Sequence, residues 1–213
     1  ILGDIGNLSS MTCIQRSIMN FGILMVQGLV NSFDPVVMAA FAAAVKIDTF
    51  AYLPVQDFGN AFSTFVAQNY GAGQRERIRK GTRTALGLTI IFSVIISGLV
   101  CLFAGPLMGI FVKTGEDAVI AAGVTYLRME GACYFGIGIL FLLYGYYRAI
   151  KKPGMSVVLT VISLGTRVGL AYGTAGMIGV TGIWLAIPIG WALADAVGLI
   201  WMKLRPLPES IEA

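Results

Sequence analysis

Residues 34–83 read DPVVMAAFAAAVKIDTFAYLPVQDFGNAFSTFVAQNYGAGQRERIRKGTR. Most of this stretch is apolar, and it is longer than the roughly 20 residues that a helix needs to cross a bilayer. It nevertheless carries Lys46, Asp48 and Asp57, with Pro54 between the two acids. Ionisable groups at membrane depth are energetically costly, so they are candidates for function. The stretch therefore predicts a membrane helix that carries functional polar residues and ends in a basic segment.

The composition of the whole chain agrees with this interpretation. Of its 213 residues, 57% are hydrophobic and 12% are charged, and the mean hydropathy is +0.81. A soluble domain carries about 25% charged residues, so we predict an integral membrane protein. The net charge of +4 does not indicate nucleic acid binding, because the basic residues lie mostly in short segments between apolar runs. The chain lacks histidine and its three cysteines are far apart, so neither a metal site nor a disulfide framework is expected.

The apolar runs predict an all-α bundle of six transmembrane helices, forming a single membrane domain over residues 1–213. The helices are expected at about residues 8–31, 35–69, 82–103, 117–150, 154–172 and 181–202. The second and fourth are longer than one span, so they should tilt, kink or project from the bilayer. Pro54 cannot donate a hydrogen bond to the carbonyl of Phe50, so the second helix should bend there. Small residues at intervals of four predict close packing of the last two helices: Gly165, Gly169 and Gly173 on one, and Ala186, Gly190, Ala194 and Gly198 on the other.

Basic residues occur in alternate connections between these helices. Five cations and one acid lie in residues 74–83, and further cations follow the fourth and sixth helices: Arg148, Lys151, Lys152, Lys203 and Arg205. The connections on the opposite side carry few cations. Cytoplasmic loops are enriched in lysine and arginine, so we predict a multi-pass protein of the cell (plasma) membrane with both termini in the cytoplasm.

The first predicted helix carries a polar stripe. It consists of Arg16, Asn20, Gln27 and Asn31, with Gln15 beside it. A polar stripe on a membrane helix should not face lipid. It either lines a water-filled cavity on a substrate or ion pathway, or it forms hydrogen bonds between helices. The two interpretations have equal weight.

The second predicted helix carries two adjoining polar stripes. One contains Asp48, Tyr52, Gln56 and Asn60, and the other contains Asp57, Asn60 and Thr64. Asp57 follows the bend expected at Pro54, and a carboxylate at membrane depth is a candidate for proton exchange. The alternative is a structural acid that is neutralised by a cation on another helix.

Two charge patterns suggest contacts between the second and fourth helices. Lys46 and Asp48 are two residues apart, and Arg128 and Glu130 repeat this arrangement. One hypothesis pairs Lys46 with Glu130, or Arg128 with Asp48, as an ion-pair gate whose contacts depend on conformation. The alternative is that Lys46 and Arg128 extend to the membrane interface. The remaining internal charges are expected to be structural: Arg167 and Asp195.

Motifs of enzymes are missing from the sequence. It contains no H-E-x-x-H zinc motif, no G-x-S-x-G nucleophile elbow and no phosphate-binding P-loop. The G-x-G at Gly136 and Gly138 lies inside an apolar helix and does not indicate a nucleotide site. We therefore predict no catalytic residues and no enzymatic activity.

Several stretches resemble the multidrug and toxic compound extrusion (MATE) transporters, and together they extend over nearly the whole chain. They are Asn20–Phe33, Ala39–Pro54, Ser63–Gly73, Tyr126–Gly131, Gly145–Pro153 and Gly182–Trp191. The most specific element is V-A-Q-N-Y-G-A-G, residues 66–73, followed by the basic segment.

The resemblance implies a transporter of twelve helices in two six-helix lobes, of which this chain is similar to the C-terminal lobe. The sequence starts at Ile1 without a signal peptide, so we expect a fragment whose N-terminal lobe lies outside it. The implied function is secondary active efflux of amphipathic, often cationic drugs or metabolites, coupled to Na⁺ or H⁺. The implied partners are membrane lipid, the N-terminal lobe and a small organic cation. No cofactor is implied besides the coupling ion.

The coupling residues cannot be carried over directly from the family. Some members use a carboxylate midway along the tenth helix, but the corresponding position here falls near Ile137. Others use an acid in the first lobe. Asp57 and Glu130 are therefore candidates on the basis of their own chemistry. The alternative functions are a flippase for a lipid-linked substrate and a non-transporting membrane scaffold or channel subunit.

Overall fold

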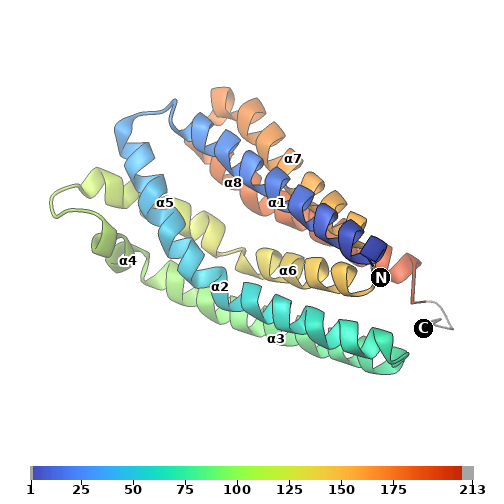
Figure 1. Ribbon diagram of the computed structural model, residues 1–213. Coiled ribbons are helices and arrows are strands. Elements are labelled where there is room, and N and C mark those ends of the chain that lie inside the picture. The colour runs from blue at the N-terminus through green and yellow to red at the C-terminus, as the bar shows by residue number, and fades with distance from the viewer. Residues whose placement is uncertain (1, 208–213) are drawn as a thin grey trace.

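The computed structural model describes residues 2–207, without the side chains of residues 2–5, 7 and 8, and this part of the chain is helical without strands (Figure 1). Its helices are α1 (Leu2–Val30), α2 (Pro35–Gly71), α3 (Arg75–Leu102), α4 (Ala104–Phe111), α5 (Asp117–Gly131), α6 (Tyr134–Ala149), α7 (Pro153–Ile178) and α8 (Val180–Leu204). In the described residues, α1, α2, α3, α7 and α8 are long and apolar enough to cross a membrane. A sixth span is formed if α5 and α6 are counted together. The predicted all-α membrane fold is confirmed.

Helix α2 begins at a well-formed cap. The Asp34 side chain accepts hydrogen bonds from the backbone N–H groups of Val36 and Val37, at 2.7 and 3.1 Å. Pro35 occupies the first turn, where its missing N–H costs nothing. The helix continues through Pro54 for 37 residues. Figure 1 shows that α2 changes direction partway along its length, as expected of a helix with an internal proline.

The predicted helix at 117–150 is in fact broken. Helices α5 and α6 meet at an angle of 52°, and the break lies at residues 132–133. The N–H of Cys133 donates to the carbonyl of Glu130 at 2.9 Å, so the backbone forms a tight turn here. Gly131 faces Val100 of α3 closely, and an added Cβ would lie 3.3 Å from the Val100 side chain. Broken helices are tolerated at membrane depth where they are buried in protein or line a cavity.

The start of α3 also differs from the prediction. The basic segment is not a loop, because α3 begins at Arg75 rather than near residue 82. The connection from α2 is short, and Gly73 adopts φ +69°, which glycine tolerates best. Glu76 pairs with Arg79 at 3.6 Å and with Lys80 at 3.5 Å on the exposed surface of the first turns. The short helix α4 was not predicted.

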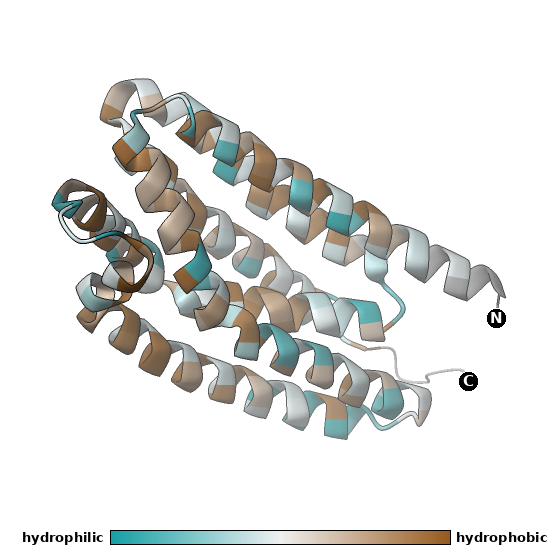
Figure 2. Cartoon of the chain, turned by 60° about the vertical axis from the view of Figure 1, so that its left-hand side comes forward, coloured by the Kyte–Doolittle hydropathy of each residue, from teal (hydrophilic) through white to brown (hydrophobic). Residues whose placement is uncertain are grey.

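The helices form two groups. Helix α7 packs along α8 and against α1, and these three lie side by side in Figure 1. Helix α2 packs against α3, α5 and α6. Helix α6 joins the groups, since it contacts α2, α3, α7 and α8, and residues 142–147 are buried without interruption. Figure 2 shows that hydrophobic residues predominate along the helices and hydrophilic ones interrupt them locally.

Only one of the two predicted small-residue faces is a packing face. On α8, the four small residues are buried, and an added Cβ at Gly190 would collide with the carbonyl of Ser163 on α7. On α7, Gly165, Gly169 and Gly173 are exposed, with no atom within 4 Å of an added Cβ. Helix α7 therefore approaches α8 through a different face, which sequence spacing alone could not distinguish.

Candidate functional site

A cavity of about 310 Å³ lies between the two groups of helices. Its size falls within the range of roughly 300–1,000 Å³ that is typical of small-molecule sites. Its polar and charged lining comes from α1, α2, α5, α6 and α7: Arg16, Gln27, Asp48, Thr49, Tyr52, Gln56, Tyr126, Glu130, Tyr144, Ser163 and Arg167.

At this cavity lies a group that we call the acid cluster: Asp48, Tyr126, Glu130 and Arg167, which line the cavity, and Tyr134, which contacts Asp48. Asp48 and Glu130 are 2% and 4% exposed, so both carboxyl groups are almost fully removed from solvent. The hydroxyl of Tyr134 donates a hydrogen bond to Asp48. Tyr126 and Glu130 line the same cavity as Asp48.

The fold holds the members of the acid cluster firmly. Tyr126 is fixed by edge-to-face contacts with Phe41 and Trp184, at ring centroid distances of 5.4 and 5.6 Å. Glu130 ends α5 immediately before the break, and Tyr134 begins α6 immediately after it. The break therefore brings residues from two consecutive helices to Asp48 on α2. A change of angle at the break would alter these contacts directly.

The charges of the acid cluster do not balance. Arg167 lines the same cavity as both acids, so ionised side chains would give two negative charges against one positive charge. Within the described residues, Asp48 Oδ2, Glu130 Oε2 and Arg167 Nε are buried without a hydrogen-bond partner. Two carboxylates in contact repel each other unless a proton or a cation neutralises one of them. The arrangement is suited to taking up one monovalent cation.

The predicted ion pairs are not formed. Lys46 is exposed, and its ammonium lies 5.9 Å from the ring centroid of Phe111. Arg128 is also exposed. In the described part of the chain, no ion pair within 4.0 Å joins either cation to Asp48 or Glu130. A spacing of two residues turns a helix by about 200°, so each cation points away from the acid on its own helix.

The structure also corrects the expected position of Asp57. Its side chain is exposed, whereas the preceding Gln56 lines the cavity. One step along a helix rotates the side chain by about 100°, which is enough to separate the two. Asp57 is therefore not the buried acid that was expected past Pro54.

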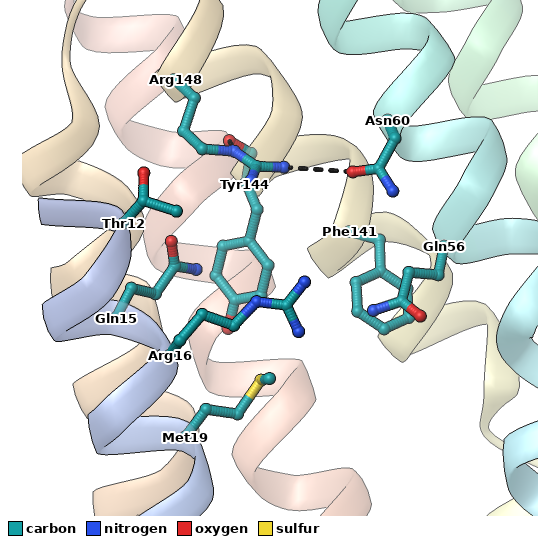
Figure 3. Close-up of a pocket in the computed structure, with 9 residues that line it drawn as sticks. All are labelled: Thr12, Gln15, Arg16, Met19, Gln56, Asn60, Phe141, Tyr144 and Arg148. Atoms are coloured by element: carbon teal, nitrogen blue, oxygen red, sulfur yellow. Dashed lines mark hydrogen bonds between the residues drawn. The ribbon is translucent and has the colours of Figure 1, made fainter. Parts of the chain in front are cut away.

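A second hollow, which we call the arginine cleft, has a volume of about 40 Å³. It is lined by Thr12, Gln15, Arg16, Met19, Gln56, Asn60, Phe141, Tyr144 and Arg148 (Figure 3). Arg148 Nη2 donates to Asn60 Oδ1 at 3.4 Å, and Arg148 Nε donates to the carbonyl of Tyr144 at 3.2 Å. Several lining residues, among them Arg16 and Tyr144, also line the larger cavity, so the two spaces adjoin.

The polar stripe of α1 is divided by the structure. Gln15 and Arg16 line the arginine cleft, and Gln27 lines the larger cavity. Gln27 also donates to Asn31, the residue directly after the end of α1, at 3.1 Å. Asn20 is exposed and lines neither space. The stripe thus contributes to a cavity wall, and the Gln27–Asn31 bond joins α1 to the residue that follows it rather than to another helix.

Sequence reasoning missed the tyrosines of the acid cluster and treated Arg167 as structural. Tyr126 and Tyr134 lie eight residues apart on either side of Glu130, which is an available but weak signal. Arg167 was a stronger signal, because a lone cation in an apolar helix needs an acid on another helix. Asp195 is buried on α8 but lines neither the cavity nor the cleft.

A bundle of membrane-spanning helices with buried charges around a polar cavity is the architecture of a membrane transport protein. Residues 11–173 match the family described as MatE, and the chain belongs to this family. Its members are transporters rather than enzymes and cross the membrane several times. This confirms the family resemblance and the expectation of a multi-pass membrane protein.

Curated relatives match over most of this chain. It is 26% identical to the probable multidrug resistance protein YpnP of Bacillus subtilis, over 89% of this chain and 42% of that protein. It is 25% identical to the FAD transporter of Shewanella oneidensis, over 77% of this chain and 36% of that protein. The chain therefore spans about two fifths of the length of these relatives.

Solved structures show the same fold. The MATE transporter ClbM in complex with Rb⁺ matches with a TM-score of 0.88 and 24% identity, over 99% of this chain and 48% of that one. A MOP superfamily transporter from Pyrococcus furiosus matches with a TM-score of 0.86 and 19% identity, over 95% of this chain and 45% of that one. The six-span bundle therefore has the fold of one half of these transporters.

Proposed function

We propose that this chain is the C-terminal lobe of a secondary active transporter that exports amphipathic drugs or metabolites in exchange for Na⁺ or H⁺. The observation that carries the proposal is the acid cluster, in which two buried carboxyl groups and one guanidinium border the same cavity. Membership of a transporter family supports the same function. The relatives' names include both multidrug resistance and FAD transport, so the family alone leaves the substrate open.

The acid cluster supplies a physical basis for coupling. Binding of a cation relieves the repulsion between Asp48 and Glu130, so the cation favours the conformation that brings them together. A ligand shifts a conformational equilibrium only by its difference in affinity for the two states. Because Glu130 and Tyr134 flank the break between α5 and α6, a change in the angle of the break would change the affinity for the cation.

The arrangement of the helix ends supports the proposed orientation. Figure 1 shows that the start of α1, the end of α8, the α2–α3 connection and the α6–α7 connection lie at one end of the bundle. The basic residues at the start of α3 and after α6 are at this end. By the positive-inside rule, this end of the bundle faces the cytoplasm. In the proposed orientation, the start of α1 and the end of α8 are therefore both on the cytoplasmic side of the plasma membrane.

Transport further requires the N-terminal lobe. The cavity of this chain is one wall of the proposed substrate path, and a second six-helix lobe would close it. Alternate access then follows from rocking of the two lobes in the lipid bilayer. The resemblance implies a cationic substrate for the complete transporter, whereas the arginine cleft places two cations on the wall that this lobe contributes.

The proposal is tested with the full-length transporter in sealed vesicles that are loaded with a fluorescent substrate. We expect efflux that depends on an imposed Na⁺ or H⁺ gradient and stops when the gradient is dissipated. Several amphipathic compounds of both charges are to be compared, because the substrate is unknown. Efflux of none of them under either gradient would contradict the proposal.

A further inference from the structure

We propose that the arginine cleft binds an anionic group, a carboxylate or a phosphate, carried by an amphipathic ligand. This inference rests on the proposed function, since it names the substrate class for the same cavity. The observation that carries it is the convergence of Arg16 from α1 and Arg148 from α6 on one small space, with no Asp or Glu among the described residues that line it.

Figure 3 shows how the two arginines are directed. Both side chains point into the space between α1 and α2, one from each side of Tyr144. The lining residues that the structure describes include three amide side chains, Gln15, Gln56 and Asn60, and no Asp or Glu. The two guanidiniums share one small space and carry like charges, so they repel each other.

An anion between the guanidiniums would remove this repulsion. Arginine presents a planar fork of donors that matches carboxylate and phosphate oxygens, often through two bonds at once. The amide oxygen of Asn60 already accepts from Arg148, so the amide N–H₂ of Asn60 remains a donor for a ligand. The cleft therefore offers a high density of donors, which suits an anion and disfavours a cation.

The sizes of the two spaces predict how such a ligand lies. A volume of about 40 Å³ accommodates roughly three water molecules, which is comparable to a carboxylate or phosphate group. The adjoining cavity of about 310 Å³ has apolar and aromatic walls that include Ile23, Leu140, Phe141 and Leu164. The anionic head then occupies the cleft and the apolar body occupies the cavity, while the acid cluster repels a second anion.

The test measures binding by the full-length transporter without any gradient, in nanodiscs of phosphatidylcholine alone. The probes are fluorescein and rhodamine 6G, which share a xanthene ring and differ in charge, and the readout is fluorescence anisotropy. The variants are Arg16→Gln and Arg148→Gln, with Arg148→Lys to restore the charge. Arg83→Gln is the matched control, because Arg83 is exposed on α3 and outside the cleft.

We expect the wild type to bind fluorescein more tightly than rhodamine 6G. Each glutamine variant should weaken fluorescein binding about tenfold, since it removes a charged hydrogen-bond donor. Arg148→Lys should restore part of the affinity, and Arg83→Gln should leave it unchanged. Tighter binding of rhodamine 6G, no binding of fluorescein, or glutamine variants with unchanged fluorescein affinity would overturn the proposal.

A second arm distinguishes the two sources of an anionic group. If a lipid headgroup occupies the cleft, phosphatidylglycerol in the nanodiscs should lower fluorescein affinity in the wild type but not in Arg148→Gln. If the group belongs to the transported molecule, fluorescein affinity should be the same with and without phosphatidylglycerol. Either of these two results supports an anion site in the cleft. This binding measurement needs no gradient, so fluorescein can bind even if the protein shows no coupled efflux. Conversely, fluorescein binding can be absent while rhodamine 6G is exported. The anion site and the proposed transport function are therefore tested separately.

Discussion

The acid cluster and the arginine cleft border the same cavity, but the acid cluster has an excess of acidic groups and the cleft has an excess of basic groups. In the acid cluster, Asp48 and Glu130 are buried, Tyr134 donates to Asp48, and one guanidinium, Arg167, borders the same cavity. In the cleft, Arg148 is half-buried and Arg16 is exposed, and the described part of the chain places no acid in its lining. With both acids ionised, the acid cluster would need one more positive charge for balance. The arginine cleft would need negative charge to balance its two guanidiniums. The comparison indicates that a small cation and an anionic group can be bound in one cavity at separate places.

The acid cluster should therefore be necessary for coupling, whereas the cleft should not. Replacing Asp48 with Asn removes one of the two negative charges, so the cluster no longer needs a cation. We expect gradient-driven efflux to fall by about a hundredfold, the upper end of ordinary coupling energies. Fluorescein binding in nanodiscs should persist in this variant. Loss of both activities together would show that the two regions are not separate.

Arg167 should matter for stability because it is the guanidinium that offsets two buried acids. Replacing Arg167 with Gln leaves both acids uncompensated and should lower the free energy of unfolding by about 3 kcal/mol. Adding Glu130→Gln should restore a large part of this loss, and thermal unfolding in detergent measures both. A loss in the double variant that equals the sum of the two single losses would contradict an interaction between Arg167 and Glu130.

Tyr134, which donates to Asp48, should change the affinity of the acid cluster for the coupling ion without being essential for ion binding. Tyr134→Phe removes one hydrogen bond to a charged group, which is worth about 1.5–3 kcal/mol. We expect the concentration of Na⁺ or H⁺ that gives half-maximal efflux to shift by about tenfold, with little change in fluorescein binding. An unchanged ion dependence would argue that Tyr134 has only a packing role.

The smallest effect on efflux is expected for Lys46 and Arg128, the exposed cations that the sequence suggested as parts of an ion-pair gate. Lys46 lies over Phe111, a contact worth about 0.5–1 kcal/mol at an exposed site. Lys46→Gln and Arg128→Gln should therefore each change the efflux rate by less than about twofold. A strong loss that is rescued by exchanging charges between Lys46 and Glu130 would restore the gate hypothesis.

The fold was predictable to the extent that membrane burial dictates it. Apolar runs of about 20 residues must form helices in lipid, because their backbone groups have no other partners. The break at residues 132–133 was not predictable, since it depends on the packing of Gly131 against α3 and not on a change in composition. The helical start of α3 could have been predicted, because arginine, lysine and glutamate favour helices and Glu76 and Lys80 have the favourable spacing of four.

The candidate site was predictable in part. Asp48, Glu130, Gln56 and Arg16 were recognised from polarity in apolar helices, and the structure places them at one cavity. Their partners were not recognised, because spacing relates residues within a helix but not the rotation of one helix against another. The same limit explains why exposed Asp57 could not be distinguished from Gln56 beside it.

The most direct measurement of the central claim compares Glu130→Gln with Asp57→Asn in the full-length transporter. Both variants remove one carboxylate, but only Glu130 is buried in the acid cluster. Efflux from vesicles is measured under Na⁺ and H⁺ gradients at equal protein content. The account predicts that Glu130→Gln abolishes dependence on the gradient while Asp57→Asn retains it. Gradient-driven efflux that survives in Glu130→Gln and is lost in Asp57→Asn would contradict the account.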